Sequence, residues 1–371
     1  MIPRLPEESI LQALNNSKLV LVSGPKRAGK ELLIDKILTE KNVVADIIDC
    51  SIKSERNVIS ETLEATTADL VVFNDAEHIV DLQSYIDLAL SGSIKPSLLL
   101  LCSFPPSIEL ELIEALQQEG LYFKIYAPTF YEAASHFGLP NEEKLLEERL
   151  IFGNYPEVLN DLDGAEPKLR ELITEVIDTH LGVNDRINKH EKLWRTLQLL
   201  AFSIGEPLSY LEIGERAGLD NETVMRYIAL FEQADILIRL PSYSKDNRYE
   251  LKKSNCVYFM DNGIRNALIS NFNPTFLRND MDQLWKNYLV SERIKWTRMN
   301  GIQSEFCFWR THTRQQMDLL EIKPNEICAY KMDWEKRKKV KLPNYFTELY
   351  PSAVSRVLNR STYWPFLSKK Q

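Results

Sequence analysis

The chain has 371 residues, which is more than one ordinary domain holds and predicts two or three. Its hydrophobic content of 44% is enough for real cores, yet no apolar run approaches the length of a membrane-spanning helix. Residues 1–8 are polar and contain two prolines, unlike a signal peptide, and the five cysteines form no C-x-x-C pair or zinc spacing. We therefore expect a cytoplasmic protein with reduced thiols and no membrane partner.

The charge is unevenly distributed along the chain. The net charge is −8, but residues 1–150 alone carry −11, so the remainder carries +3. An anionic polymer would therefore meet the C-terminal part first.

A phosphate-binding signature, G-x-x-x-x-G-K, occupies residues 24–30. An apolar strand at 18–23 enters this loop, and an amphipathic helix at 31–38 leaves it. In such a loop the backbone N–H groups and the helix N-terminus cradle phosphates, while the lysine reaches the β- and γ-phosphates. The predicted ATP-binding residues are Gly24, Pro25, Lys26, Arg27, Ala28, Gly29, Lys30 and Glu31.

Glu31 stands where serine or threonine normally supplies a hydroxyl ligand for Mg²⁺. A carboxylate there adds negative charge beside an anionic ligand. The substitution therefore favours nucleotide binding over hydrolysis.

Apolar strands and helical patterns alternate over the first part of the chain, which predicts an α/β fold with a parallel sheet. The expected strands are 18–23, 43–49, 70–75, 98–103 and 122–127, with a helix at 109–118 among the connections.

Acidic residues after the strand at 70–75 predict the second half of an ATP site. Asp75 is the candidate catalytic acid and Mg²⁺ ligand, but Ala76 follows it where a glutamate usually orients the attacking water. Glu77 comes one position late, and it is the candidate catalytic base if the protein is a slow ATPase. Ser103 either senses the γ-phosphate or is a plain turn residue.

The later regions predict three further modules. Residues 142–181 are helical, and helices at 211–217 and 222–233, the second capped by Asp220 or Asn221, form a helix-turn-helix. A hairpin at 236–240 and 255–259 completes a winged-helix layout. A helix at 284–296 and strands at 306–310, 318–322 and 326–330 follow.

Motifs in a fixed order carry a family resemblance over nearly the whole chain. They are the glycine loop, residues 71–75, 127–132 and 152–159, the helix-turn-helix, and residues 258–264 and 308–311. The chain resembles prokaryotic AAA-type P-loop ATPases with a C-terminal domain of unknown function.

The resemblance implies a parallel AAA-type core at residues 1–138, a helical lid at 139–190, a winged helix at 191–272 and a restriction-endonuclease-like α+β domain at 273–371. Gly24, Gly29, Lys30 and Asp75 match the family pattern, whereas Glu31 and Ala76 depart from it.

The nuclease-like end lacks part of its expected metal site. Such a site uses an aspartate and a second carboxylate to hold a metal, with a nearby lysine. Here Asp318 and Lys331 are present, Ala329 replaces the second carboxylate, and Lys286 stands at another acidic position. Although Glu321 or Asp333 could substitute, we do not expect nuclease activity.

Basic residues leave nucleic acid as a possible partner. The densest run is 336–339, and the predicted wing is also basic. The candidate contacts are Lys245, Arg248, Lys336, Arg337, Lys338 and Lys339.

The leading hypothesis is an ATP-binding protein with impaired or absent hydrolysis that acts as a regulatory or scaffold component, with a nucleic acid or a protein as its partner. A slow ATPase and a nucleotide-independent DNA-binding protein are the alternatives.

Overall fold

The computed structural model describes residues 2–178, 187–245, 249–251, 254–335 and 340–368. The chain forms two compact units, Met1–Pro128 and Thr129–Gln371. Within the described ranges, no helix combines the length and the apolar character needed to cross a membrane.

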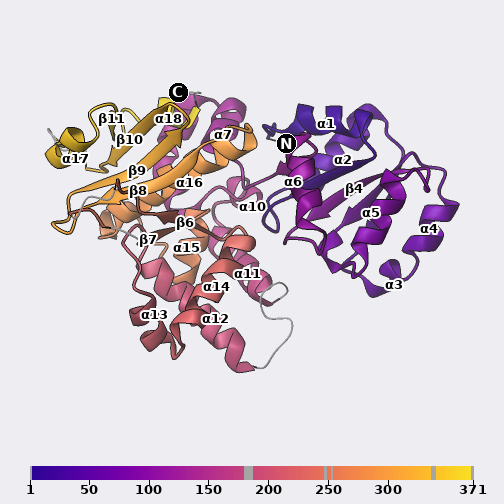
Figure 1. The fold of residues 1–371 in the computed structure, drawn as a ribbon, viewed down its shortest axis with the longest axis horizontal. Coiled ribbons are helices and arrows are strands. Elements are labelled where there is room, and N and C mark those ends of the chain that lie inside the picture. Colours follow the sequence, from indigo (N-terminus) through magenta and orange to yellow (C-terminus); the bar gives the residue numbers. More distant parts are fainter. Residues whose placement is uncertain (1, 179–186, 246–248, 252–253, 336–339, 369–371) are drawn as a thin grey trace. The chain divides into compact units, whose positions relative to one another are not determined.

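The N-terminal unit is built on a five-stranded parallel sheet (Figure 1). The strand order is β2-β3-β4-β1-β5, and every pairing is parallel. This confirms the α/β class and the parallel sheet expected from the sequence. The strands are β1 (Leu19–Ser23), β2 (Ala45–Asp49), β3 (Leu70–Asn74), β4 (Ser97–Cys102) and β5 (Tyr122–Lys124).

Helices cover both faces of this sheet, so its central strands are buried on both sides and read as continuous apolar runs. One face packs against α1 (Glu7–Asn16) and α2 (Lys30–Lys41). The other packs against α4 (Ile59–Ala65), α5 (Leu82–Leu90) and α6 (Leu110–Gln118). Two short elements, α3 (Lys53–Arg56) and η1 (Ala76–His78), complete the unit.

The crossings place a topological switch point between β1 and β4. These strands are neighbours, but α2 leaves β1 on one face of the sheet, whereas α6 leaves β4 on the other. Open parallel sheets bind ligands at the carboxyl ends of the strands flanking such a point. The glycine loop lies there because it follows β1 directly.

The C-terminal unit combines a helical region with two small sheets. The antiparallel pair β6 (Leu237–Pro241) and β7 (Asn255–Phe259) forms the predicted hairpin. The second sheet has the order β11-β10-β9-β8, with only β10 and β11 parallel. Its strands are β8 (Glu305–Arg310), β9 (Gln316–Lys323), β10 (Glu326–Met332) and β11 (Val354–Leu358).

The helices of this unit precede, separate and follow those strands. They are α7 (Phe130–Phe137), α8 (Leu139–Lys144), α9 (Leu146–Phe152), α10 (Pro156–Leu159), α11 (Ala165–Val176), α12 (Ile187–Phe202), α13 (Tyr210–Ala217), α14 (Asn221–Gln233), α15 (Asn262–Leu268), η3 (Thr275–Leu277), α16 (Met281–Met299), α17 (Asn344–Leu349) and α18 (Trp364–Ser368).

The helix-turn-helix forms as its local sequence dictates. Gly218 takes a left-handed conformation (φ 67°) after α13, and Asp220 caps α14 by accepting a hydrogen bond from the Thr223 N–H at 2.7 Å.

The connection between β6 and β7 pairs with β8. The Tyr243 N–H donates to Phe308 O (2.7 Å), and the Leu251 N–H donates to Arg310 O (2.8 Å). The base of the predicted wing is therefore joined to the C-terminal sheet. The division of this unit into a lid, a winged helix and a nuclease-like domain stays a prediction.

A buried carboxylate organises the segment where Gly and Pro interrupt the helical pattern. Asp261 accepts hydrogen bonds from the N–H groups of Asn154 and Gly263, both at 2.8 Å. Gly153 (φ 73°) lies so close that a Cβ there would be 1.9 Å from the Asp261 Oδ1 atom. This segment therefore needs glycine for both its conformation and its close approach to Asp261.

We predict that Gly153→Ala destabilises the C-terminal unit by about 3 kcal/mol or more, because it adds a steric clash to a left-handed conformation. Gly301→Ala is the matched control, since Gly301 has a similar φ of 62° but no atom within 4 Å of its Cβ position. It should cost only about 1 kcal/mol. Urea unfolding of both variants tests this, and equal losses of stability would contradict the account.

Candidate functional site

The glycine loop has the strand, turn and helix that a phosphate-binding loop requires. Gly24 follows β1, and a Cβ there would lie 1.7 Å from the Ile125 backbone oxygen, so only glycine fits. Gly29 takes a left-handed conformation (φ 93°) before α2 begins at Lys30. These two glycines therefore meet steric demands of the backbone at both ends of the loop.

The Lys30 side chain is fully buried at the centre of this loop. Its ammonium donates hydrogen bonds to Gly24 O, Pro25 O and Ser103 Oγ, each at 3.1 Å. The Oε1 atom of the Glu31 carboxylate is 3.7 Å from Nζ. The buried positive charge is therefore surrounded mainly by neutral oxygen atoms.

Asp75 and Glu77 converge on the same place through Ser103. The Ser103 hydroxyl donates to Asp75 Oδ1 at 3.3 Å, and the Ser103 N–H donates to Glu77 Oε1 at 3.0 Å. Lys26 lies 3.9 Å from Asp75 Oδ2. The structure thus brings Lys30, Asp75, Glu77 and Ser103 together at the carboxyl ends of neighbouring strands.

Glu77 has a strongly perturbed environment. Burial raises the pKa of its carboxyl to about 7, and the nearby Asp75 charge adds to this, whereas backbone hydrogen bonds and Lys30 oppose it. Glu77 lies one residue after the position where the glutamate is usual, so the sequence did not show whether its side chain reaches the site. In the structure, the turn into η1 brings Glu77 beside Ser103.

Arg4 is a component of the loop that the sequence analysis missed. Its buried guanidinium donates to Ala28 O at 3.0 Å and also to Tyr126 O. These contacts tie the loop to the segment after β5. No local pattern reveals them, because the partners are 24 and 122 residues away in the sequence.

The protein side chains at this site do not by themselves provide enough ligands for Mg²⁺. Asp75 and Glu31 offer carboxylate oxygens, which suit Mg²⁺, but each lies within 4.0 Å of a lysine ammonium. Among the residues that the structure describes, no three histidine, cysteine, aspartate or glutamate side chains are grouped to hold a metal. Phosphate oxygens would have to supply the remaining ligands.

Lysines occupy the space around the predicted nuclease aspartate. Asp318 is fully buried on β9, with Lys286 at 3.1 Å, Lys331 at 3.2 Å and the Met332 N–H donating at 2.8 Å. Burial alone would raise the pKa of Asp318, but these two ammonium groups and the N–H hold it below its usual value. Asp318 is thus neutralised by side chains of the protein itself.

Glu321, a proposed substitute ligand, also has a partner. The Arg293 guanidinium donates to both of its carboxylate oxygens, at 2.9 and 3.0 Å, in a fully buried pair. Asp333 follows β10, where its N–H donates to Leu358 O.

The predicted nucleic-acid contacts are only partly visible. Lys245 is exposed, and its ammonium lies 5.2 Å from the centre of the Tyr350 ring. Arg248, Lys336, Arg337, Lys338 and Lys339 lie outside the described residues. DNA binding through these residues stays a prediction.

The chain is similar to a family of domains and to a curated protein. A family model described as a domain of unknown function (DUF8612) matches residues 143–275. A curated relative, an uncharacterized protein of Haemophilus influenzae, is 21% identical over 291 residues, which cover 71% of this chain and 72% of that protein.

Two solved structures illustrate the structural likeness. The Walker-type ATPase PABY2304 of Pyrococcus abyssi is 14% identical, with 72% of this chain and 96% of that chain covered and a TM-score of 0.47. The RuvB Holliday junction branch migration motor of Thermotoga maritima is 15% identical, with 65% and 90% covered and a TM-score of 0.34.

We predict that Asp318→Asn destabilises the protein by about 2–4 kcal/mol at pH 7, since it leaves two lysines facing a neutral, buried partner. The pKa of Asp318 is lowered by folding, so its contribution is present above the unfolded pKa of about 4 and is lost as the pH falls below it. The difference from the parent protein should therefore stay constant from pH 7 to about pH 5 and shrink as the pH falls below about 4.

Chemical unfolding across this pH range is the measurement. The control is Asp161→Asn, which breaks the largely exposed pair with Lys168 and should change stability little. A pH-independent effect of Asp318→Asn would contradict the ion-pair account.

Proposed function

We propose that the N-terminal unit binds ATP through residues 24–31, with impaired or absent hydrolysis, and that the protein is a nucleotide-dependent regulatory or scaffold component. The observation that carries this proposal is the buried Lys30 ammonium at the carboxyl end of β1, surrounded by backbone carbonyls and Ser103. This position is the switch point where open parallel sheets bind their ligands.

The electrostatics of Lys30 support an anionic ligand. Its three hydrogen-bond acceptors are neutral, and a buried charge gains most from a charged, hydrogen-bonded partner. Phosphate oxygens would replace the loop carbonyls as the hydrogen-bond acceptors of Lys30. The backbone N–H groups of the loop, between Gly24 and Gly29, would then cradle the phosphates. Lys30 would then contact the β- and γ-phosphates.

Two side chains support impaired hydrolysis. Glu31 adds a carboxylate 3.7 Å from the Lys30 ammonium, in the place of the hydroxyl that ligates Mg²⁺ in a working site. Ala76 has no group to orient an attacking water. Asp75 would hold any Mg²⁺ through water, together with the phosphates.

We predict that Lys30→Ala weakens ATP binding at least 30-fold, because one charge-assisted contact to phosphate contributes about 2 kcal/mol. Calorimetric titration with ATP, with and without Mg²⁺, measures this. Lys41→Ala is the matched control, since this exposed lysine ends the same helix and should leave affinity unchanged. Equal affinity of the Lys30→Ala variant and the parent would exclude the assignment.

A slow ATPase is the second candidate function, and the position of Glu77 favours it. Its carboxylate accepts the Ser103 N–H at 3.0 Å, while the Ser103 hydroxyl contacts both Lys30 and Asp75. Glu77 is therefore placed in the same cluster as the predicted phosphate and Mg²⁺ residues. Glu77 would act there as the general base that activates the attacking water, in place of the glutamate that is missing at Ala76.

If this candidate is correct, Glu77→Gln lowers the single-turnover rate of ATP hydrolysis at least 100-fold, which is the usual contribution of a general base. Glu64→Gln, at an exposed position on α4, is the control and should retain the parent rate. Undiminished turnover in the Glu77→Gln protein would exclude the slow ATPase and leave the binding function in place.

A further inference from the structure

Strand β2 forms an edge of the parallel sheet, because it pairs with β3 on one side and has no strand on the other. Just after β2, the Cys50 N–H donates to Asn74 O at the end of β3. The N–H of the preceding residue, Asp49, points away from β3 and donates to the Glu55 carboxylate at 2.7 Å. Since backbone groups alternate along a strand, those of Ala45 and Ile47 point away from β3.

The edge is closed at one end and open at the other. The Glu55 side chain caps it at Asp49, a common way of blocking an edge strand. In the part of the chain that the structure describes, no strand or side chain is recorded on the outer backbone groups of Ala45 and Ile47. This stretch is a ready template for an added strand.

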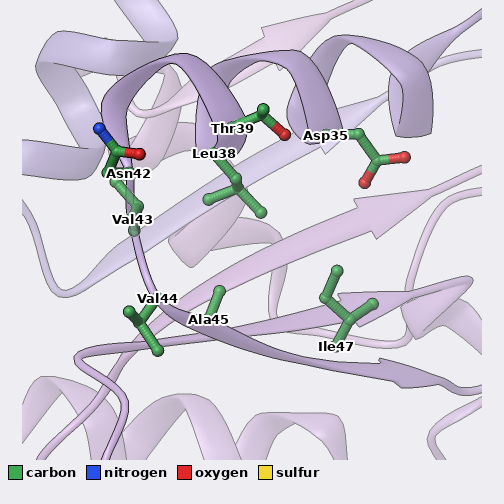
Figure 2. Close-up of a pocket in the computed structure, with 8 residues that line it drawn as sticks. All are labelled: Asp35, Leu38, Thr39, Asn42, Val43, Val44, Ala45 and Ile47. Carbon is green, nitrogen blue, oxygen red and sulfur yellow. The ribbon is translucent and has the colours of Figure 1, made fainter.

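A depression of about 730 Å³ lies beside this open edge, between the end of α2 and β2. Figure 2 shows Leu38 and Asp35 on α2 above Val44, Ala45 and Ile47. Val44 and Ile47 are 74% and 49% exposed, which is unusual for aliphatic side chains next to a strand edge. The depression thus combines aliphatic side chains with the polar residues Asp35, Thr39 and Asn42.

The charge of the unit indicates which occupant fits. Residues 1–128 carry a net charge of −8, and Asp46 and Asp49 lie on β2 itself. A second copy that paired through the same edge would bring these carboxylates together, at an unfavourable Coulomb energy. A basic segment would instead be attracted to the edge.

We propose that β2 binds an extended peptide segment of a partner protein, in which apolar and basic side chains alternate. The segment pairs with the outer backbone groups of Ala45 and Ile47 as a sixth strand. Its apolar side chains fill the depression beside Leu38 and Val44. Its basic side chains project to the other face of the sheet, where Asp46 lies. This surface is separate from the glycine loop, so the inference does not depend on nucleotide binding.

The test uses the full-length protein and an acetylated hexapeptide of alternating lysine and valine, with hydrogen exchange as the readout. We expect slower exchange of the Ala45 and Ile47 amides when the peptide binds. A peptide with proline in place of each valine lacks half of the backbone donors and should give no protection. A glutamate–valine hexapeptide should bind at least tenfold more weakly.

Charge reversal at the edge makes the test specific. Asp46→Lys should weaken binding of the lysine–valine peptide at least threefold, whereas Asp87→Lys, at an exposed position on α5, should not. Binding without protection at Ala45 and Ile47, or equal binding of all three peptides, would overturn the proposal. So would a dimer in sedimentation that Ile47→Lys dissociates, since it would assign the edge to a second copy.

Discussion

The burial of one positive charge governs the N-terminal unit. Lys30 has no exposed surface, yet its ammonium must have acceptors, because an isolated buried charge is strongly unfavourable. The loop carbonyls and Ser103 provide them only if β1 and β4 are neighbours and the chain turns sharply at Gly24. Strand order, the two glycines and the position of Lys30 therefore depend on one another. The Arg4 contacts to Ala28 and Tyr126 strengthen the same arrangement from outside the loop.

Two buried carboxylates of the C-terminal unit, Asp318 and Glu321, have basic side chains of the protein as partners. Asp318 faces two lysines, and Glu321 accepts hydrogen bonds from the Nε and Nη2 atoms of Arg293. Such buried pairs are costly to break, because removing one partner leaves an unpaired charge. Asp318 and Glu321 therefore belong to structural ion pairs, and an arriving cation would have to displace two ammonium groups from Asp318.

Local sequence patterns predicted the N-terminal sheet well. The apolar runs around β1, β3 and β4 and the glycine loop contain their own signals, since a doubly buried strand is apolar throughout and the loop needs glycine at fixed spacing. The sequence left the cap of α14 open between Asp220 and Asn221, and Asp220 is the cap in the structure.

Contacts between residues far apart in the sequence could not be predicted from local patterns. The contacts of Arg4, the pairing of Lys286 with Asp318, and the hydrogen bonds between the wing base and β8 depend on residues far apart in the sequence. The reach of Glu77 depended on where β3 ended: the strand stops at Asn74, and the left-handed Asp75 turns the chain toward Ser103. The three predicted boundaries between the four domains are not tested by the fold, which divides into two compact units at Pro128.

Hydrogen exchange of the loop amides, measured with and without ATP, tests the central claim most directly. If phosphates replace the carbonyl partners of Lys30, the N–H groups between Gly24 and Lys30 should exchange more slowly when ATP is present. The amides of helix α14, which belongs to the C-terminal unit, should be unaffected. Unchanged exchange in the loop at saturating ATP would contradict the account and show that Lys30 stabilises the fold without binding nucleotide.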